Sequence, residues 1–357
     1  MSRADSAALP PLPVTCADVE AARPLIAGAV LRTPTLRAPR LSALTGADVW
    51  VKYENFQVTA AFKERGALVK LSRMTPQEAA RGAVAMSAGN HAQAVAHHGT
   101  RLGISTTIVM PLTTPLVKVM ATEAFGARVV LHGESVGDAA AEARRIADAE
   151  GRIFVHPYDD PDVIAGQGTI GLEMIEDGPH FDSVVVPIGG GGLISGIALA
   201  FAGHAPDTQV VGVEAALYPA MWSILTGIEK PCGGPTLAEG IAVHEVGMLT
   251  RAIVRRLVPH IVLADEPALE RAVNAFVTHQ KTLAEGAGAA GLAALLTEPE
   301  RFRGQTVGLA LCGGNIDPRM LASILLRELE RDQRIVSFRL TILDRPGMLG
   351  LISTLIG

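Results

Sequence analysis

The sequence predicts an α/β fold built from two mostly parallel sheets with helices on both faces. Short runs rich in β-branched residues alternate with longer Ala-rich segments of helical pattern. Strands separated by helices of this length are typical of βαβ crossovers, which give parallel sheets covered on both faces. Glycine- or turn-rich segments follow two of the strands, and ligands collect at the carboxyl ends of parallel strands. We therefore expect two sheet modules that face one cleft.

Each expected element is a run bounded by turn residues. The strands are Val49–Lys52, Ala83–Met86, Thr106–Met110, Arg128–Leu131, Ile153–His156, Ser183–Ile188, Gln209–Val213 and Thr306–Leu311. The longer helical segments between them are Ala92–Leu102, Gly137–Ala149, Asp162–Glu176 and Glu266–Gln280. The pattern predicts element type more firmly than element ends.

Composition excludes several classes of protein. The chain has 357 residues, of which 48% are hydrophobic and 19% charged, which is typical of a globular protein. A net charge of −5 gives no reason to expect nucleic acid or an anionic membrane as a partner. The three cysteines share no metal-ligand spacing, so we expect a reducing, cytoplasmic setting. There is no signal peptide pattern, and no apolar run approaches the roughly 20 residues that span a bilayer.

The two ends of the chain differ in character from the rest. Residues 1–15 are rich in Ala, Ser and Pro and predict a flexible arm. Near the other end, Glu328–Arg334 is expected to be a charged linker, and Val336–Leu343 alternates like a strand before the turn Asp344–Gly347.

The run Gly189–Gly192 follows a buried strand and precedes a helical segment that opens with Leu193. Successive glycine N–H groups and a helix N-terminus together can bind a phosphate. The run lacks the Gly-Lys-Ser/Thr ending of nucleotide-hydrolysing loops and the spacing of a dinucleotide fold. A tight turn chosen only for packing is the alternative, but four glycines carry a large cost in backbone entropy. A phosphorylated cofactor is the favoured interpretation.

Two further segments can carry chemistry. Lys63 follows the apolar residues Ala60, Ala61 and Phe62, and partial desolvation there would lower its pKa and suit Schiff-base chemistry. Taken alone, however, an ordinary solvated surface lysine is the favoured interpretation, because most lysines are of that kind. Ser87–His91 starts a helix and could hold a carboxylate, or serve only as an N-cap.

Cys312 and two histidines are weaker candidates. Cys312 follows a strand, but no His/Asn or His/Asp arrangement supports a nucleophile, so a small buried thiol is the default. His97 and His98 lack a carboxylate or a third-ligand pattern and are expected to be non-catalytic.

Seven strings carry a resemblance that covers Ala21 to Glu330. In order they are TAAFKERGA, SAGNHAQAVA, HPYDDPDVIAGQGTIGLE, PIGGGGLISG, TLAEGIAV, EGAGAAG and LCGGNID. The chain resembles the threonine dehydratase (threonine ammonia-lyase) and serine racemase group of the tryptophan-synthase-β-like, fold-type-II pyridoxal-phosphate enzymes. The resemblance implies a large domain of residues 16–50 and 160–331, a small domain of residues 51–159, and an active site between them.

The resemblance also implies a role for each matching position. Lys63 would hold pyridoxal 5′-phosphate covalently, with Phe62 packed near the ring. The cofactor phosphate would be bound by Gly189, Gly190, Gly191, Gly192 and Leu193. Asn90 would bond the phenolic oxygen and Cys312 would face the pyridine nitrogen. The substrate carboxylate would be bound by Ser87, Ala88, Gly89, Asn90 and His91.

The implied reaction is deamination of L-threonine to 2-oxobutanoate and ammonia, with L-serine as a secondary substrate and a place in isoleucine biosynthesis. Dehydration of 3-hydroxyaspartate or β-replacement on the same scaffold is the nearest alternative, and a non-catalytic amino-acid sensor is a remote one. Relatives are commonly dimers or tetramers, so a homo-oligomer is expected. Residues 332–357 would be a linker and the start of an ACT domain, since VSFRLTILDRPGMLGLISTLIG resembles the beginning of that module.

Four positions depart from the family pattern. Ala60 and Ala61 replace the Gly and Ser of many relatives, which affects contacts with the substrate. Ala88 stands where racemising relatives have a serine, so serine racemisation is disfavoured because alanine cannot donate a proton. No metal site is expected. Glu214 matches a cation ligand of some relatives, but Ala220 replaces the second carboxylate.

Overall fold

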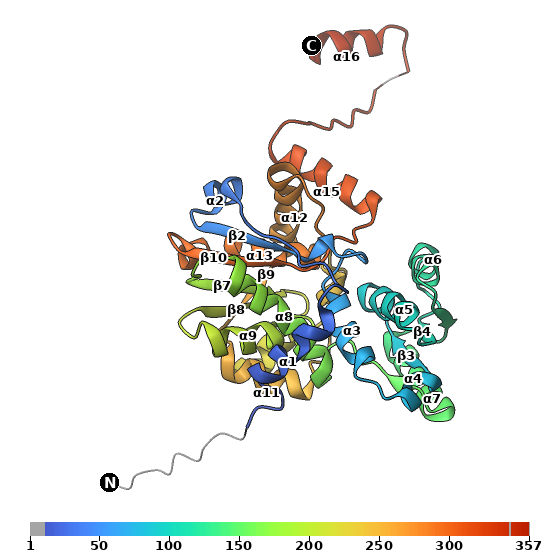
Figure 1. The fold of residues 1–357 in the computed structure, drawn as a ribbon. Helices are drawn as coiled ribbons and strands as arrows, with labels where there is room; N and C mark the ends of the chain where they lie inside the picture. The colour runs from blue at the N-terminus through green and yellow to red at the C-terminus, as the bar shows by residue number, and fades with distance from the viewer. Residues whose placement is uncertain (1–10, 343, 357) are drawn as a thin grey trace. The chain divides into compact units, whose positions relative to one another are not determined.

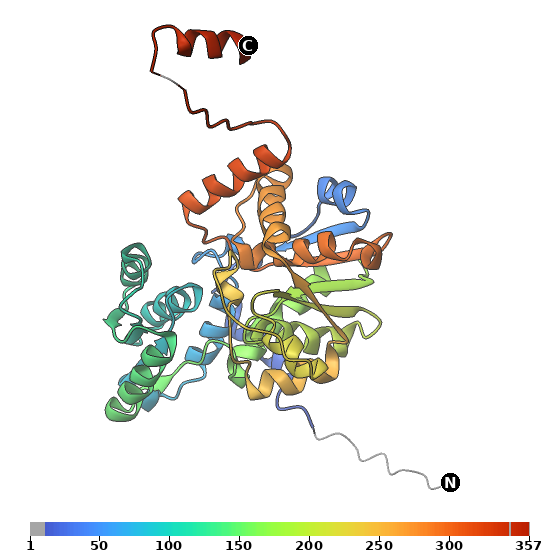
Figure 2. The same ribbon diagram turned by 180° about the vertical axis from the view of Figure 1, so that it is seen from behind.

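The computed structural model describes residues 11–342 and 344–356. The chain divides into two compact units, Met1–Asp317 and Pro318–Gly357. Figures 1 and 2 show the first unit from two sides, with its two sheets and their covering helices. Among the described residues, no helix has both the length and the hydropathy needed to cross a bilayer.

The larger sheet has six strands. Their order is β1 (Thr35–Arg37), β2 (Asp48–Tyr53), β10 (Thr306–Leu311), β7 (Ser183–Pro187), β8 (Gln209–Ala215) and β9 (His260–Ala264). Only β1 is antiparallel to its neighbour, and the other pairs are parallel. One face carries α8 (Pro161–Asp177) and α9 (Gly192–His204), and the other carries α12 (Glu266–Ala275) and α13 (Gly286–Thr297). Every residue of β7 is buried, as expected for a strand covered on both faces.

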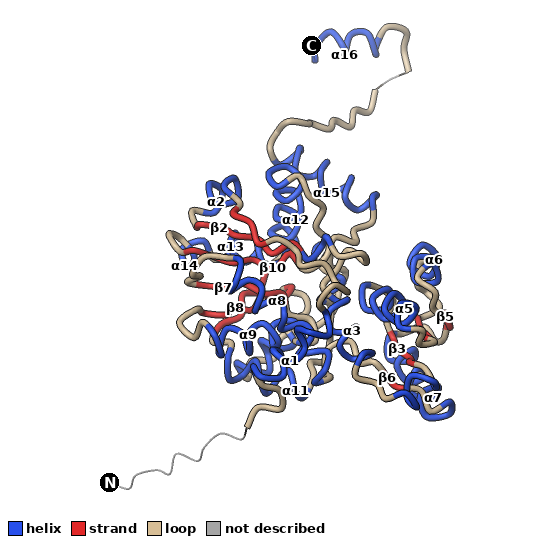
Figure 3. Tube along the Cα trace, viewed as in Figure 1, coloured by secondary structure: helices blue, strands red, loops and turns tan. Residues whose placement is uncertain are grey.

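The smaller sheet has four parallel strands. Their order is β5 (Arg128–Leu131), β4 (Thr106–Met110), β3 (Ala83–Met86) and β6 (Ile153–Phe154). Side chains of β3 alternate between two cores. Ala83 and Ala85 pack in the core that includes α5 (Asn90–Leu102) and α6 (Leu116–Ala124), and Val84 packs with α7 (Val136–Glu150). This two-residue period places helices on both faces, and Figure 3 shows the strands of both sheets in red.

The remaining elements connect or cover these layers. They are α1 (Cys16–Ile26), α2 (Pro39–Thr45), η1 (Glu54–Phe56), α3 (Lys63–Ser72), α4 (Pro76–Arg81), α10 (Ala220–Thr226), η2 (Glu239–Ile241), α11 (Met248–Leu257), η3 (Phe276–Gln280) and α14 (Pro299–Phe302). Helix α3 packs against both α8 and α5, so it joins the larger sheet's layer to the smaller one's. The second unit contains α15 (Pro318–Arg331) and α16 (Met348–Ile356).

The predicted α/β class with parallel sheets is confirmed, and four strands have the predicted ends. Strands β1 and β9 were not predicted. The expected boundary at residues 50/51 falls inside β2, which pairs wholly within the larger sheet. The expected helix Glu266–Gln280 ends as a regular α-helix at Ala275 and continues as the π-helical turn η3. The assignment of the two sheets to separate domains stays a proposal.

Corrections concentrate at the chain ends. Of the expected flexible arm, residues 1–10 lie outside the described residues, but Val14 is buried and Thr15 caps α1 through a capping box with Asp18. The expected linker at Glu328–Arg334 is wrong in its first half. Helix α15 continues to Arg331, and an ion pair between Glu328 and Arg331, one turn apart, supports its last turn.

The strand expected at Val336–Leu343 is also wrong where it can be checked. Residues 336–342 form neither a helix nor a strand and have exposed side chains, and Leu343 lies outside the described residues. A strand needs a partner for its backbone groups, and the described residues contain none that pairs here. The turn before α16 lies as expected, with Gly347 at φ +86° directly before the helix. The likeness of this segment to the start of an ACT domain stays a prediction.

Candidate active site

Lys63 is the first residue of α3 and is held by a turn that docks on the segment after β10. The Phe62 amide donates to the Cys312 carbonyl at 3.0 Å, and the Gly314 amide donates to the Ala60 carbonyl at 2.9 Å. The Lys63 Nζ atom is partly buried and donates to the Pro157 carbonyl at 2.7 Å. Burial lowers the pKa of Lys63 to about 8. About one-fifth of this amine is therefore neutral at pH 7.4, far more than for an ordinary lysine, and the neutral form is the one that a nucleophile or base requires.

The four-glycine run forms the bend between β7 and α9. A Cβ on Gly190 would lie 2.2 Å from the Tyr158 ring, and Gly191 has φ +94°. Both positions therefore require glycine. Tyr158 directly follows Pro157, whose carbonyl accepts the Lys63 amine, so two consecutive residues contact the lysine and the glycine bend.

The N-terminus of α9 is buried without a side-chain cap. Gly191 is the N-cap, and the first-turn residues Gly192, Leu193 and Ile194 are all buried. The first N–H groups of a helix have no partner within the helix, so a buried end of this kind needs an external acceptor. An anion such as a phosphate satisfies it and is favoured by the helix dipole.

The turn after β3 leads into α5, a second helix whose N-terminus has no side-chain cap. Helix α5 begins at Asn90 with Gly89 as N-cap and no side-chain cap, so the alternative of an ordinary Ser or Asn cap is wrong. The Ser87 hydroxyl instead accepts from the Gly89 amide at 3.1 Å. Burial, followed by the nearby Lys63 charge, lowers the pKa of His91 to about 3, so this imidazole is neutral. The N–H groups of this turn are suited to a carboxylate.

Cys312 and Glu285 complete the surroundings of the lysine. The buried Cys312 thiol lies 3.6 Å from the Ala287 carbonyl, and burial raises its pKa well above the usual range. It therefore stays a protonated thiol rather than a nucleophilic thiolate. Burial also raises the pKa of Glu285 to about 7, and this carboxylate accepts from Asn90 Nδ2 at 2.8 Å.

Residues 26–313 match the family model described as pyridoxal-phosphate dependent enzyme. The chain belongs to this family. It is 41% identical over 348 residues to an L-threonine ammonia-lyase of Thermotoga maritima, covering 96% of this chain and 86% of that protein. Among solved structures it resembles threonine deaminase isoform 2 of Solanum lycopersicum (TM-score 0.80, 33% identity, 86% of this chain and 90% of that one). It also resembles maize serine racemase (TM-score 0.82, 31% identity, covering 90% of this chain and 99% of that one).

The residues present fit the family cofactor, pyridoxal 5′-phosphate. The buried, uncapped N-terminus of α9 offers backbone donors for the phosphate. The Lys63 amine is held toward the neighbouring Pro157–Tyr158 segment with a lowered pKa. Cys312 is connected to the turn before the lysine because its carbonyl accepts from the Phe62 amide. Asn90 is connected to the same turn through Asn315, which donates both to Asn90 and to the Thr59 carbonyl. Lys63 and the glycine bend thus lie within one compact unit, connected through Pro157 and Tyr158.

Several residues at this site were not singled out in the sequence. They are Pro157, Tyr158, Thr250, Glu285 and Asn315. Thr250 Oγ1 donates to the Gly190 carbonyl at 2.7 Å and supports the bend from α11. Pro157 and Tyr158 stand just after a predicted strand, the position at which ligand-binding turns occur, so their placement was a usable signal. Nothing in the pattern around Thr250 marks it.

The two doubtful metal-site candidates have different surroundings. Both oxygens of the buried Glu214 accept backbone N–H groups, from Met221 and Trp222, at 2.8 Å. The expectation that no carboxylate lies near His97 and His98 is wrong, because Glu64 Oε2 lies 3.8 Å from His98 Nε2. Burial lowers the pKa of His98 to about 3, so this pair is not an ion pair.

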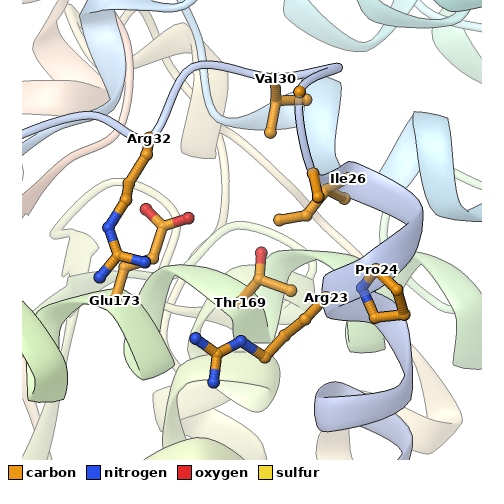
Figure 4. A pocket seen from close by; sticks show the side chains of 9 residues that line it. Arg23, Pro24, Ile26, Val30, Arg32, Thr169 and Glu173 are labelled. Carbon is orange, nitrogen blue, oxygen red and sulfur yellow. The ribbon is translucent and has the colours of Figure 1, made fainter.

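A buried charge cluster anchors the helix that begins at Lys63. Arg65 is fully buried and bonds both Glu54 and Glu173, and Lys52 also bonds Glu173. Glu173 and Thr169 line a pocket of about 440 Å³ whose rim carries Arg23 and Arg32 (Figure 4). That pocket lies between α1, the following loop and α8, and its lining includes neither Lys63 nor the glycine bend.

Proposed function

We propose that this chain deaminates L-threonine to 2-oxobutanoate and ammonia, and L-serine to pyruvate and ammonia as a secondary activity. The observation that carries the proposal is a lysine of lowered pKa that donates to Pro157, next to Tyr158 on the four-glycine bend, in a chain 41% identical to an L-threonine ammonia-lyase. When bound, pyridoxal 5′-phosphate supplies an electron sink for the negative charge left at Cα.

The chain's own residues would bind and orient that cofactor. Gly189–Leu193 would donate backbone N–H groups to its phosphate, and Asn90 would donate to its phenolic oxygen. Phe62 would pack near the ring, where its own ring centroid lies 5.0 Å from Lys63 Nζ. Lys63 would hold the cofactor covalently before the substrate amine takes its place.

Proton transfer would fall to Lys63. Its Nζ, neutral once displaced, would remove the Cα proton while the N–H groups of Ser87–His91 bind the substrate carboxylate. The protonated Cys312 thiol cannot hold a proton on the ring nitrogen as a carboxylate would. Loss of the Cα proton would then be coupled to departure of the β-hydroxyl, the two together making one water, which favours elimination. The released enamine would tautomerise and take up one water to give the 2-oxo acid and ammonia.

Racemisation is a further alternative on this scaffold, because maize serine racemase shares the fold. It needs a proton donor on the face of the substrate opposite the lysine. Ala88, which lies in the carboxylate-binding turn, has no proton to give. Hydroxyaspartate dehydration and β-replacement differ from threonine deamination only in the substrate or the second reactant, and a product assay separates them.

The test compares wild-type protein with Lys63→Ala and with the exposed-lysine control Lys230→Ala. We expect Lys63→Ala to lose the visible absorbance of bound cofactor and all release of 2-oxo acid and ammonia. Lys230→Ala should keep both. Threonine, serine and hydroxyaspartate are each supplied with and without a thiol nucleophile. Retained turnover in Lys63→Ala would refute the role of the lysine, and exclusive turnover of another substrate would refute threonine.

We also propose that the protein works in the cytoplasm as a homo-oligomer. The free thiols of Cys16, Cys232 and Cys312 support a reducing compartment. Light scattering on the purified holoenzyme checks the assembly, and a monomer at micromolar concentration would contradict it.

A further inference from the structure

The carboxamide of Asn90 is hydrogen-bonded on two sides. Its Nδ2 donates to Glu285 Oε1 at 2.8 Å, and its Oδ1 accepts from Asn315 Nδ2 at 2.8 Å. The same Asn315 Nδ2 donates to the Thr59 carbonyl at 2.8 Å. Four residues from four separate chain segments are therefore linked in one row.

The row permits only one orientation of the Asn90 amide. The Thr59 carbonyl can only accept, so the Asn315 atom facing it must be the NH₂ group. That group also faces Asn90, so the Asn90 atom on this side must be the oxygen. The Asn90 NH₂ group then lies on the side of Glu285, whose carboxylate accepts from it.

Glu285 occupies a place that is built for this contact. It is the N-cap of α13, yet its side chain makes no capping bond to that helix. A Cβ on Gly313 would lie 2.3 Å from Glu285 Oε1, so this glycine leaves the room the carboxylate needs. The backbone adds a link, because the Glu285 amide donates to the Gly313 carbonyl at 3.1 Å.

We propose that Glu285 and Asn315 are positioning residues that lock the Asn90 carboxamide, so that its second N–H is left to donate to the phenolic oxygen of the cofactor. This inference rests on the proposed function for the place of Asn90. Of the two amide hydrogens, one is used on Glu285, and Asn90 makes no other side-chain donation among the described residues. An unlocked amide could turn its oxygen toward the ring oxygen and repel it.

Protonation of Glu285 should leave the lock intact. The charged or titratable groups that act on Glu285 are Lys118 of α6, Glu239 of η2, Lys63 of α3 and Cys312 after β10. Lys118 and Glu239 pair with each other at 2.8 Å. A protonated carboxyl, like a carboxamide, still offers one oxygen to accept from Asn90. Glu285→Gln should therefore preserve the orientation that Glu285→Ala removes.

The experiment measures the dissociation constant for pyridoxal 5′-phosphate and the visible spectrum of the reconstituted protein. Glu285→Ala should weaken cofactor binding about tenfold, because a partly buried amide loses its carboxylate partner. Glu285→Gln should stay within about threefold and mainly change the pH profile of kcat. Asn315→Asp should weaken binding as Glu285→Ala does, since a carboxylate there would turn the Asn90 amide around.

Asn55→Ala is the matched control. Its side chain donates to Thr282 Oγ1 and the Leu283 carbonyl, near this row but without contact to Asn90. Asn315 is exposed, so Asn315→Asp should fold and tests the orientation of the Asn90 amide even if Glu285→Ala does not fold. Wild-type affinity in both Glu285→Ala and Asn315→Asp would overturn the proposal, as would equal losses in the Gln and Ala variants. Cofactor binding without threonine turnover in the wild type would overturn the proposed function instead.

Discussion

Removing Arg65 from the buried charge cluster that anchors the helix starting at Lys63 should greatly lower the free energy of unfolding. Lys52, Glu54, Arg65 and Glu173 are all buried, with two positive and two negative charges. Arg65 makes two hydrogen bonds to each carboxylate, at distances of 2.7 to 2.9 Å. Its charge, followed by its hydrogen bonds, outweighs burial and holds the pKa of Glu54 below its usual range. Arg65→Met keeps much of the volume and removes only the charge and the donors.

The size of the effect follows from the partners left behind. Glu173 would keep its ion pair with Lys52. Glu54 would keep hydrogen bonds only from the uncharged Thr33 Oγ1 and Gln57 Nε2, and Lys52 would act on it through its charge without a hydrogen bond. Breaking a buried pair by removing one partner costs about 3–5 kcal/mol of the free energy of unfolding. Adding Glu54→Gln removes the stranded charge, so the double variant should recover about 1–3 kcal/mol of that loss.

Urea unfolding followed by circular dichroism measures these free energies. Arg145→Met is the control, because Arg145 is an exposed arginine paired with Glu142 on α7, and its removal should leave the unfolding curve unchanged. Kinetics on Arg65→Met should show a reduced kcat, since Arg65 lies on the first turn of the helix that begins with Lys63. Two outcomes would refute the view that Glu54 depends on Arg65. One is a loss of less than about 1 kcal/mol in the free energy of unfolding of Arg65→Met; the other is a double variant whose loss equals the sum of the losses in Arg65→Met and Glu54→Gln.

Three further outcomes are expected. Ala60→Gly should raise the free energy of unfolding by about 0.5–1 kcal/mol. Ala60 has φ +55°, and glycine relieves more backbone strain than it adds in entropy of the unfolded chain. A variant with a lower free energy of unfolding would contradict this. Gly190→Ala should abolish binding of pyridoxal 5′-phosphate, since its Cβ would displace Tyr158, whereas the control Gly137→Ala on α7 should bind normally. In the apoprotein, the rate of Lys63 acylation, followed by mass spectrometry, should rise with pH through a midpoint near 8, because burial favours the neutral amine. A midpoint near the ordinary lysine pKa of about 10.4 would contradict this reasoning.

The elements that the sequence predicts well are those whose pattern is local. The strand Ala83–Met86 is short, apolar and bounded by turns, and its ends agree with β3. Strand β1 has three residues, two of them exposed, and exists because β2 pairs with it. Such a strand leaves too short and too polar a pattern to detect. Val336–Leu343 shows the reverse error, because alternation alone cannot supply a pairing partner.

The residues of the candidate site also fall into two groups, those marked by a local sequence pattern and those brought together only by the fold. The run Gly189–Gly192 stands out because four consecutive glycines after a strand are unusual, and Lys63 was singled out by the apolar residues before it and by the family string TAAFKERGA. Their roles stay predictions. Glu285 was missed because a glutamate before a glycine- and alanine-rich helix reads as an N-terminal charge. Its contact with Asn90 joins residues 195 positions apart, and no local pattern encodes that distance.

The strained turn before Lys63 shows how the chain fixes a reactive amine with ordinary contacts. Ala60 keeps a left-handed backbone although glycine would adopt it at lower cost. Hydrogen bonds to the segment after β10 hold this turn on both sides of Ala61, through Ala60 and Phe62. Asn315 of the same segment binds the Thr59 carbonyl. These contacts over-determine the turn, so the local strain persists without loosening the helix that starts at Lys63. The segment that carries Cys312 therefore also sets the position of the lysine, which explains how residues about 250 positions apart can act as one site.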